Sequence, residues 1–344
     1  MTSVALVVYG PLAQRTGGYL YDALMVRELG ARGRPVAVVE IERGEAAGAV
    51  AERVMGTGAP VVVFDELCHP ELAEALPRVE AARVLLVHHL TAWEPGAPAA
   101  HLPLEAACVA AADLVVATSE PTRERLEREL APSAPVVAVE PGADRLPFPP
   151  KLTPARDAAR LLFVGALGPR KRVLPLLDAA ADAGLGLAIV GEPRDAAYAE
   201  RVRARARETG AEVLGALDDD ALSLALADAD ALVLPSALEG YGMVVTEALA
   251  AGVPVIVTRA AAVAPALSHE DNALVVEEAE LPRALARYAS DRELRARLAA
   301  GAAASRPRLQ TWARAAAEMA EAIDRAVSLA ATRRARTTAP RARG

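Results

Sequence analysis

Short apolar runs recur along the chain and are separated by longer segments with helical periodicity. Runs of this kind, bounded by glycine, proline or charged residues, are typical of buried strands in βα units. In the first half of the chain the predicted strands cover residues 3–9, 35–41, 61–64, 84–87, 114–117 and 136–139. In the second half they cover residues 161–164, 187–190, 212–214, 231–234, 254–257 and 273–276. The alternation predicts an α/β protein with parallel sheets.

The two βα series are joined by a proline-rich stretch, LPFPPKLTP, at residues 146–154. Such composition indicates a linker, and 344 residues suit two domains better than one. We therefore predict two Rossmann-like domains with a cleft between them, over residues 1–145 and 146–308. Residues 280–304 are predicted to be helical. A long final helix is predicted over residues 309–331, followed by a disordered basic tail over residues 332–344.

Composition narrows the class of protein. Hydrophobic residues make up 53% of the chain but aromatic residues only 3%, so the cores are expected to be aliphatic. The formal net charge of −7 argues against a nucleic-acid partner, which usually requires a basic face. The distant Cys68 and Cys108 fit neither a metal site nor a redox motif, and they favour a cytoplasmic location.

The sequence contains no apolar run near the roughly 20 residues that a membrane span needs. The N-terminus has no basic leader before its first strand, so we expect no signal peptide. Composition leaves peripheral contact with a membrane open.

Residues 231–257 are the most informative stretch for chemistry. Glu239 follows a predicted strand, and Glu247 lies about one turn into the next predicted helix. Gly240 and Gly242 flank Tyr241 in the turn between them, which lets backbone amides at the helix start approach a phosphate. A strand, a loop and a helix start form the place where open α/β sheets bind nucleotides.

The second domain opens with a glycine-containing loop that carries positive charge. Gly165 follows a predicted strand, and Arg170 and Lys171 precede the helix predicted over residues 173–182. Positive charge at such a loop suits an anion, and a diphosphate is the obvious candidate. Lys171 and Lys151 are the only lysines in the chain, which favours a requirement for a compact ammonium group at Lys171. An ordinary exposed basic turn is the alternative.

Two features of the first half could contact a ligand. The loop that ends in Gly17 and Gly18 leads into a predicted helix, although a tight turn is the favoured explanation of these glycines taken alone. His88 and His89 follow a strand, where parallel sheets line their ligand crevice. Side chains alternate along an extended segment, so only one of the two can readily face the cleft; the alternative is a histidine that caps a neighbouring carbonyl. The other histidines receive no role.

The segment from Pro235 to Val255 resembles the E-x₇-E signature of GT-B retaining glycosyltransferases of the family 4 type. The loop at Gly17, the pair at His88, the junction at residues 141–144 and the loop at Gly165 agree with this resemblance. The family has two facing Rossmann-like domains. Its first domain binds the acceptor, its second binds a nucleotide sugar, and its final helix crosses back onto the first domain.

The resemblance implies a role for each part of the site. Arg170 and Lys171 would neutralise the diphosphate in place of a metal ion, so neither a metal nor a cofactor is expected. Glu239 would bind hydroxyls of the donor sugar, and one of His88 and His89 would lie near the reacting carbon. The implied donor-binding residues are Glu247, Gly17, Gly18, Gly240, Tyr241, Gly242, Met243, Val244 and Gly165.

The chain departs from the family pattern at two places. Ala166 stands where relatives often have arginine, and residues 259–267 lack the frequent Gly-Gly-x-x-Glu sequence. The expected reaction is transfer from a UDP- or GDP-type sugar to a small-molecule, glycan or lipid-linked acceptor. A nucleotide-sugar-binding protein or partner subunit without activity, and a sugar-nucleotide epimerase, are the alternatives. A dehydrogenase is disfavoured because neither domain opens with G-x-G-x-x-G.

Overall fold

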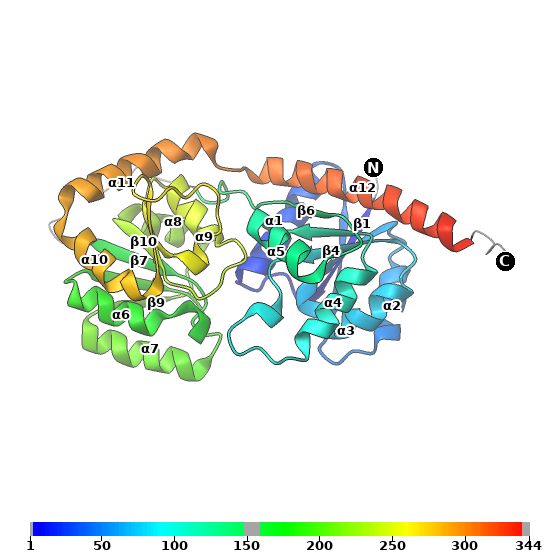
Figure 1. Cartoon of the computed structure of the whole chain (residues 1–344), viewed down its shortest axis with the longest axis horizontal. Coiled ribbons are helices and arrows are strands. Elements are labelled where there is room, and N and C mark those ends of the chain that lie inside the picture. Colours follow the sequence, from blue (N-terminus) through cyan, green and yellow to red (C-terminus); the bar gives the residue numbers. More distant parts are fainter. Residues whose placement is uncertain (1–2, 148–158, 339–344) are drawn as a thin grey trace. The chain divides into compact units, whose positions relative to one another are not determined.

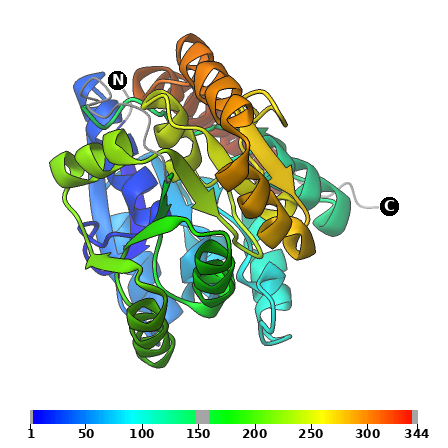
Figure 2. The ribbon, with the colours of Figure 1, turned by 90° about the vertical axis from the view of Figure 1, so that its left-hand side faces the viewer.

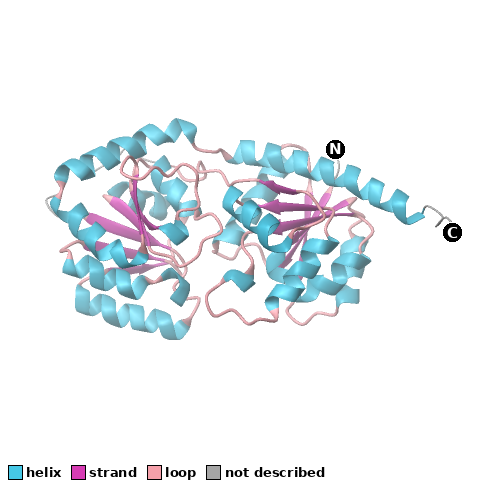
Figure 3. Cartoon of the chain, viewed as in Figure 1, coloured by secondary structure: helices cyan, strands magenta, loops and turns pink. Residues whose placement is uncertain are grey.

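The computed structural model describes residues 3–147 and 159–338, and it divides into two compact units (Figure 1). Unit 1 comprises residues 1–14, 18–141 and 312–344, and unit 2 comprises residues 15–17 and 142–311. Lys151 and most of the proline-rich linker lie outside the described residues. Each unit is built on one parallel sheet with helices around it (Figure 3).

Unit 1 has a sheet of six strands in the order β2-β1-β3-β4-β5-β6. The chain adds β2 on one side of β1 and then β3 to β6 on the other side. The strand order therefore reverses between β1 and β3, while all strands stay parallel. The strands are β1 (Val4–Tyr9), β2 (Val36–Ile41), β3 (Val61–Asp65), β4 (Ala82–Val87), β5 (Leu114–Ala117) and β6 (Val136–Ala138). The helices are α1 (Gly17–Ala31), α2 (Ala47–Gly56), α3 (His69–Ala75), α4 (His101–Ala111), α5 (Glu120–Leu130) and α12 (Trp312–Thr338).

Unit 2 has six parallel strands in the order β12-β11-β10-β7-β8-β9. The order in which the chain adds strands reverses between β7 and β10. The strands are β7 (Arg160–Val164), β8 (Gly186–Val190), β9 (Glu212–Gly215), β10 (Ala231–Leu234), β11 (Val255–Thr258) and β12 (Ala273–Val276). The helices are α6 (Val173–Asp182), α7 (Ala196–Thr209), α8 (Asp219–Asp228), α9 (Met243–Ala250), α10 (Leu281–Ser290) and α11 (Arg292–Ser305). Figure 2 looks onto this unit, with its sheet in the middle and helices around it.

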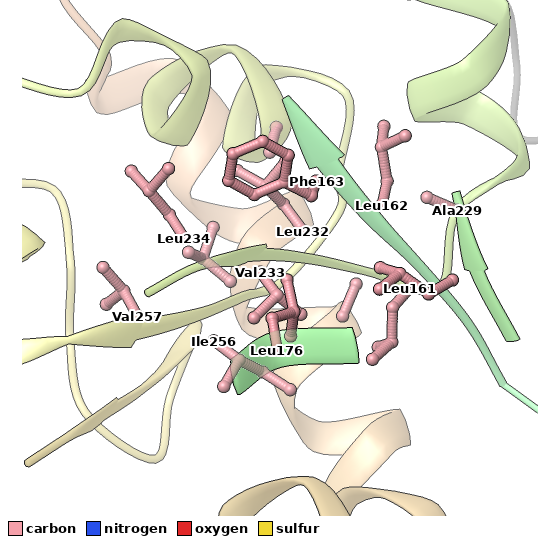
Figure 4. Close-up of a cluster of buried hydrophobic side chains, with 14 of the residues drawn as sticks. Leu161, Leu162, Phe163, Leu176, Ala229, Leu232, Val233, Leu234, Ile256 and Val257 are labelled. Carbon is pink, nitrogen blue, oxygen red and sulfur yellow. The ribbon is translucent and has the colours of Figure 1, made fainter. Parts of the chain in front are cut away.

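The apolar runs predicted as strands are the buried centres of the two sheets. In unit 2, Phe163 of β7, Leu232 of β10 and Leu176 of α6 are fully buried members of one hydrophobic cluster (Figure 4). Each such side chain contributes about 1.5–3 kcal/mol relative to an exposed one. The central strands are covered on both faces and therefore read as continuous apolar sequence. The αβ alternation and the two Rossmann-like sheets are confirmed.

The helical stretch predicted over residues 280–304 consists of two helices. Helix α10 ends at Ser290, and Asp291 then accepts a hydrogen bond from the backbone of Leu294 at 2.9 Å. A side-chain cap of this kind satisfies a free amide at a helix start, so it begins a new helix where periodicity alone predicts continuity.

Helix α12 corrects the predicted start of the basic tail. The helix runs to Thr338, whereas the sequence predicted disorder from residue 332. Arg333 donates to Asp113 at 2.7 Å and 3.2 Å, and this buried carboxylate holds the additional turn. Helix α12 packs on β4 and β5 of unit 1, as expected for a final helix that returns to the first domain.

Candidate functional site

The charged residues predicted for unit 2 lie where the strand order of its sheet reverses, between β7 and β10. Arg170 and Lys171 follow β7, and Glu239 follows β10, the neighbouring strand. The carboxyl ends of these two strands lead into connections on opposite sides, which leaves room for a ligand between them. Topology therefore brings together residues that are 68 positions apart in the chain.

The loop after β7 is held against the loop after β10. Lys171 closes the short helix η4 (Pro169–Lys171), and the backbone carbonyl of Arg170 accepts from Ala237 at 2.9 Å. A Cβ at Gly165 would lie 3.4 Å from Lys171 Cε, so the glycine makes room for the lysine stem. Arg172 then adopts a left-handed conformation with φ of 52°, which is uncommon for a side-chain-bearing residue.

Lys171 and Glu239 contact each other directly. Lys171 Nζ donates to Glu239 Oε1 at 2.6 Å, and Arg170 Nη1 lies 3.7 Å from Glu239 Oε2. The Glu239 side chain is only 8% exposed and that of Lys171 14% exposed. An ammonium group has three donors, so Lys171 can hold Glu239 and still offer protons to a ligand oxygen.

Electrostatics keep Glu239 ionised. Burial opposes its ionisation, but the charges of Lys171 and Arg170 outweigh burial and hold the pKa of Glu239 below its usual value. The residue is therefore a carboxylate that accepts hydrogen bonds at neutral pH.

Glu247 lies on the buried face of α9 and is also paired. Arg145 Nε donates to Glu247 Oε1 at 2.7 Å, and Arg145 Nη2 donates to Glu247 Oε2 at 3.2 Å. Burial raises the pKa of Glu247, and the guanidinium of Arg145 counters that rise. Arg145 was not among the predicted site residues, because it stands at the junction of the two domains in sequence.

The remaining predicted donor-binding residues of unit 2 surround the start of α9. Gly242 precedes this helix with φ of 79°, a left-handed conformation that favours glycine. Met243 and Val244 are its first two residues and are half-buried, while Tyr241 is buried and Gly240 is half-exposed. Free amides at a helix start suit a phosphate, provided that a ligand reaches them.

The two adjacent histidines of unit 1 have different surroundings. His88 is directed toward α1, where its Nε2 lies 3.4 Å from Asp22 Oδ1 and its ring packs edge-on against Tyr21. A Cβ at Gly18 would lie 3.2 Å from His88 Cδ2, and Gly17 begins the helix. His89 instead contacts Glu94 Oε1 at 2.8 Å. Which of the two serves a ligand stays a prediction.

Buried acids surround His88. Asp22, Asp65 and Glu66 are each at most 3% exposed, and Glu66 Oε2 accepts from the His88 backbone amide at 3.1 Å. Burial lowers the pKa of His88, but the neighbouring acids outweigh it and raise the pKa to about 9. Burial and Asp22 raise the pKa of Asp65 to about 7. His88 is thus an imidazolium at neutral pH.

Asp22, Asp65 and His88 each present one donor atom within 4.8 Å of the other two. Neither carboxylate oxygen of Asp22 has a hydrogen-bond partner in the part of the chain that the structure describes. Two carboxylates and an imidazole are chemically able to hold a divalent cation. The positive charge of His88 offers a different partner for the same carboxylates, so the geometry alone fits both.

The acid cluster makes the stability of unit 1 depend on pH. The folded-state pKa values of Asp65 and His88 lie above those of the unfolded chain, so the folded state binds more protons. We expect unit 1 to lose stability as pH rises from about 4 to 9, with a fall in melting temperature of roughly 5 °C or more. Calorimetry across this range measures the effect.

Asp65→Asn is the matched test, because asparagine preserves the acceptor for the Leu67 amide while removing the charge. Its melting temperature should change less than that of the wild type between pH 4 and 7. Glu74→Gln, at an exposed position of α3, should follow the wild-type profile. An Asp65→Asn profile parallel to the wild type would contradict the assignment.

Asp22, Asp65, Glu66 and Arg145 are residues that sequence reasoning missed. Asp65 and Glu66 follow the strand predicted over residues 61–64, the same signal that selected His88 and His89. Asp22 and Arg145 carry no such signal, since one lies within a helix and the other in a loop.

Among the described residues, every helix is too short or too polar to cross a bilayer.

Residues 144–305, which contain Arg145, Arg170, Lys171, Glu239 and Glu247, match the family model of the glycosyl transferases group 1. The chain is 31% identical over 238 residues to a D-inositol 3-phosphate glycosyltransferase of Thermomonospora curvata, covering 60% of this chain and 55% of that protein. It is 32% identical over 117 residues to an uncharacterised glycosyltransferase of Methanocaldococcus jannaschii, covering 34% of this chain and 33% of that protein. The chain spans about half the length, or less, of these curated relatives.

Solved structures with a similar fold cover nearly the whole chain. Sucrose-phosphate synthase from Thermosynechococcus elongatus has a TM-score of 0.79 at 20% identity, covering 93% of this chain and 98% of the other. HepE of Anabaena, in complex with UDP and glucose, has a TM-score of 0.74 at 16% identity, covering 94% and 100%. These likenesses concern the fold. Residues 144–305 thus resemble the glycosyl transferases group 1, and the chain has a GT-B fold.

Proposed function

We propose that this protein is a retaining glycosyltransferase that uses a nucleotide-sugar donor. The observation that carries this proposal is the cluster of Lys171, Arg170 and Glu239 where the strand order reverses between β7 and β10. This cluster lies within the residues that match the glycosyl transferases group 1. The cluster combines fixed positive charge for a phosphate with an ionised acceptor for sugar hydroxyls. The complex of HepE with UDP and glucose is consistent with such a donor on a similar fold.

In the proposed reaction the bond between the sugar C1 and the diphosphate oxygen breaks, and its electron pair leaves with the diphosphate. Arg170 and Lys171 stabilise the charge that develops on this leaving group, which is where fixed cations contribute most. We propose that these two side chains act there in place of a metal ion. Glu247 binds the ribose, and the start of α9 faces the phosphates.

Retention requires that the acceptor hydroxyl attacks C1 from the face that the diphosphate leaves. We propose that the departing phosphate takes the hydroxyl proton and that Glu239 binds the sugar rather than attacking it. Supporting this, Lys171 donates to Glu239 at 2.6 Å and the pKa of Glu239 is lowered, so its carboxylate is a weak nucleophile.

We propose that unit 1 binds the acceptor, which carries the reacting hydroxyl and is a small molecule, a glycan or a lipid-linked sugar. His88 lies beside Gly18 at the start of α1, and its raised pKa of about 9 makes it a hydrogen-bond donor. A donor at this position can bind a sugar hydroxyl or a phosphate oxygen.

A thermal-shift screen of the intact chain against UDP- and GDP-sugars tests the proposal. A bound donor should raise the melting temperature, by an amount that grows with the logarithm of its concentration relative to Kd, and the shift should persist in EDTA. Products formed from the responding donor and an acceptor panel are then identified by mass spectrometry, and the anomeric configuration by NMR. No shift with any nucleotide sugar would overturn the proposal, and a shift abolished by EDTA would overturn metal independence.

Binding without transfer is a second candidate function. It is favoured by Ala166 in the phosphate loop and by residues 259–267, which begin with a short helix η5 (Arg259–Ala261) and lack the glycines of the family pattern. A protein of this class would show donor-dependent thermal shifts but no product over a broad acceptor panel. Conversion of the donor alone would instead indicate an epimerase.

A further inference from the structure

Arg145 lies on a segment of unit 2 whose backbone is held by hydrogen bonds on both sides of the residue. Ala143 donates its backbone amide to Gln310 at 2.9 Å, and the carbonyl of Pro147 accepts from Ser223 of α8. Ala143 and Leu146 are 2% and 4% exposed. The Arg145 side chain, at 5% exposure, is therefore held by ordered backbone on both sides.

The guanidinium joins two carboxylates of different exposure. It donates to both oxygens of Glu247 on α9 and, through Nη1, to Asp219 on α8 at 2.6 Å. The Glu247 side chain is 3% exposed, whereas that of Asp219 is 64% exposed. Asp219 binds Arg145 from the solvent side, and Glu247 is the buried end of the network.

This pairing leaves Glu247 able to bind a further ligand. A carboxylate offers about four lone-pair sites, and Arg145 uses one on each oxygen. Two sites remain, which matches the two hydroxyl donors of a vicinal diol. The bidentate contact also fixes the plane of the carboxylate, which a single hydrogen bond would leave free to rotate.

We propose that Arg145 is the positioning residue that presents Glu247 to the ribose diol of the donor, and that it thereby sets the preference for ribonucleotides over 2′-deoxyribonucleotides. This inference rests on the proposed function, because it assumes a nucleotide bound at Glu247. A ligand that lacks the 2′-hydroxyl leaves one oriented lone pair of a buried carboxylate without a donor, and such unpaired groups are strongly disfavoured.

Removing Arg145 should change the pH dependence of nucleotide binding as well as its strength. Arg145 and Asp219 are the charged groups that act on Glu247 among the described residues. Without the guanidinium, a buried Glu247 beside a like charge takes up a proton and loses part of its capacity to accept. Nucleotide affinity of the variant should then recover as pH rises and Glu247 ionises.

Calorimetric titration of the intact chain with UDP and 2′-deoxy-UDP tests this, with GDP and its 2′-deoxy form if the donor screen selects guanine. We expect the wild type to prefer UDP by at least about tenfold. Arg145→Met should bring the two affinities toward equality at pH 6.5, with UDP binding recovering by pH 9. Arg145→Lys, which retains charge without the bidentate geometry, should be intermediate.

Asp220→Asn is the matched control, at an exposed neighbouring position of α8. It should retain the wild-type preference, and melting temperatures establish that each variant is folded. If Arg145→Met unfolds, Arg145→Lys carries the test. A wild type that binds neither nucleotide would overturn the proposed function. Binding of both with equal affinity, or an unchanged preference in both Arg145 variants, would overturn only this inference.

Discussion

Lys171→Ala is expected to lower turnover at least ~100-fold, which is the scale of losing one preorganised charge contact to a leaving group. Lys171 Nζ donates to Glu239 at 2.6 Å and is the nearer of the two cations at that carboxylate. Arg170 cannot replace it, because the nearest guanidinium nitrogen lies 3.7 Å from Glu239 and also contacts the carbonyl of Leu238. Turnover is measured with the donor that the screen identifies.

The variant also leaves a buried carboxylate with a weaker partner, so its stability must be measured alongside its activity. Arg201→Ala removes a cation from an exposed position of α7 and should leave turnover unchanged. A folded Lys171→Ala protein with near wild-type turnover would remove Lys171 from the catalytic residues. A Lys171→Arg protein should recover only part of the activity, since a planar guanidinium does not reproduce the position of a compact ammonium group at Glu239.

Gly191→Ala is expected to destabilise unit 2 by about 3 kcal/mol or more. Gly191 follows β8 with φ of 153°, and a Cβ there would lie 1.9 Å from the carbonyl oxygen of Gly165. That carbonyl cannot easily move, because the Gly165 amide donates to Val190 at 2.9 Å. The substitution should therefore displace the loop that carries Lys171 and weaken nucleotide binding as well.

Gly186→Ala is the matched control for this prediction. Gly186 begins the same strand, is exposed, and a Cβ there would meet no atom within 4 Å. Urea unfolding should show wild-type or slightly higher stability for Gly186→Ala and a clear loss for Gly191→Ala. Equal stability of the two variants would mean that the β8 to β7 contact tolerates a side chain.

Most of the fold could be predicted from the sequence because both sheets are buried on two faces. Strands of this kind read as continuous apolar runs, and β5, β10 and β12 begin and end where those runs do. The prediction failed where a local polar contact decides the structure. Asp291 divides one periodic stretch into two helices, and the contact of Arg333 with Asp113 extends α12 past its predicted end.

The same distinction between local sequence pattern and contacts of the folded chain applies to the candidate site. Glu239, Lys171 and His88 were predicted because each follows a strand, and strand ends can be recognised locally. Arg145 and Asp22 could not be predicted in this way. The partner of Arg145, Glu247, lies 102 positions away in the chain, and Asp22 meets His88 only because the helix α1 presents it there.

The sequence by itself determined the βα order, the strand positions and the set of loops able to meet a nucleotide. These depend on hydrophobic periodicity and on glycine, which act over short distances. Only the tertiary structure decided the pairing of charges: Lys171 with Glu239, Arg145 with Glu247, and His88 with the buried acids around it. Charge pairing depends on which strands are neighbours and on what burial leaves unsolvated, and both are properties of the folded chain.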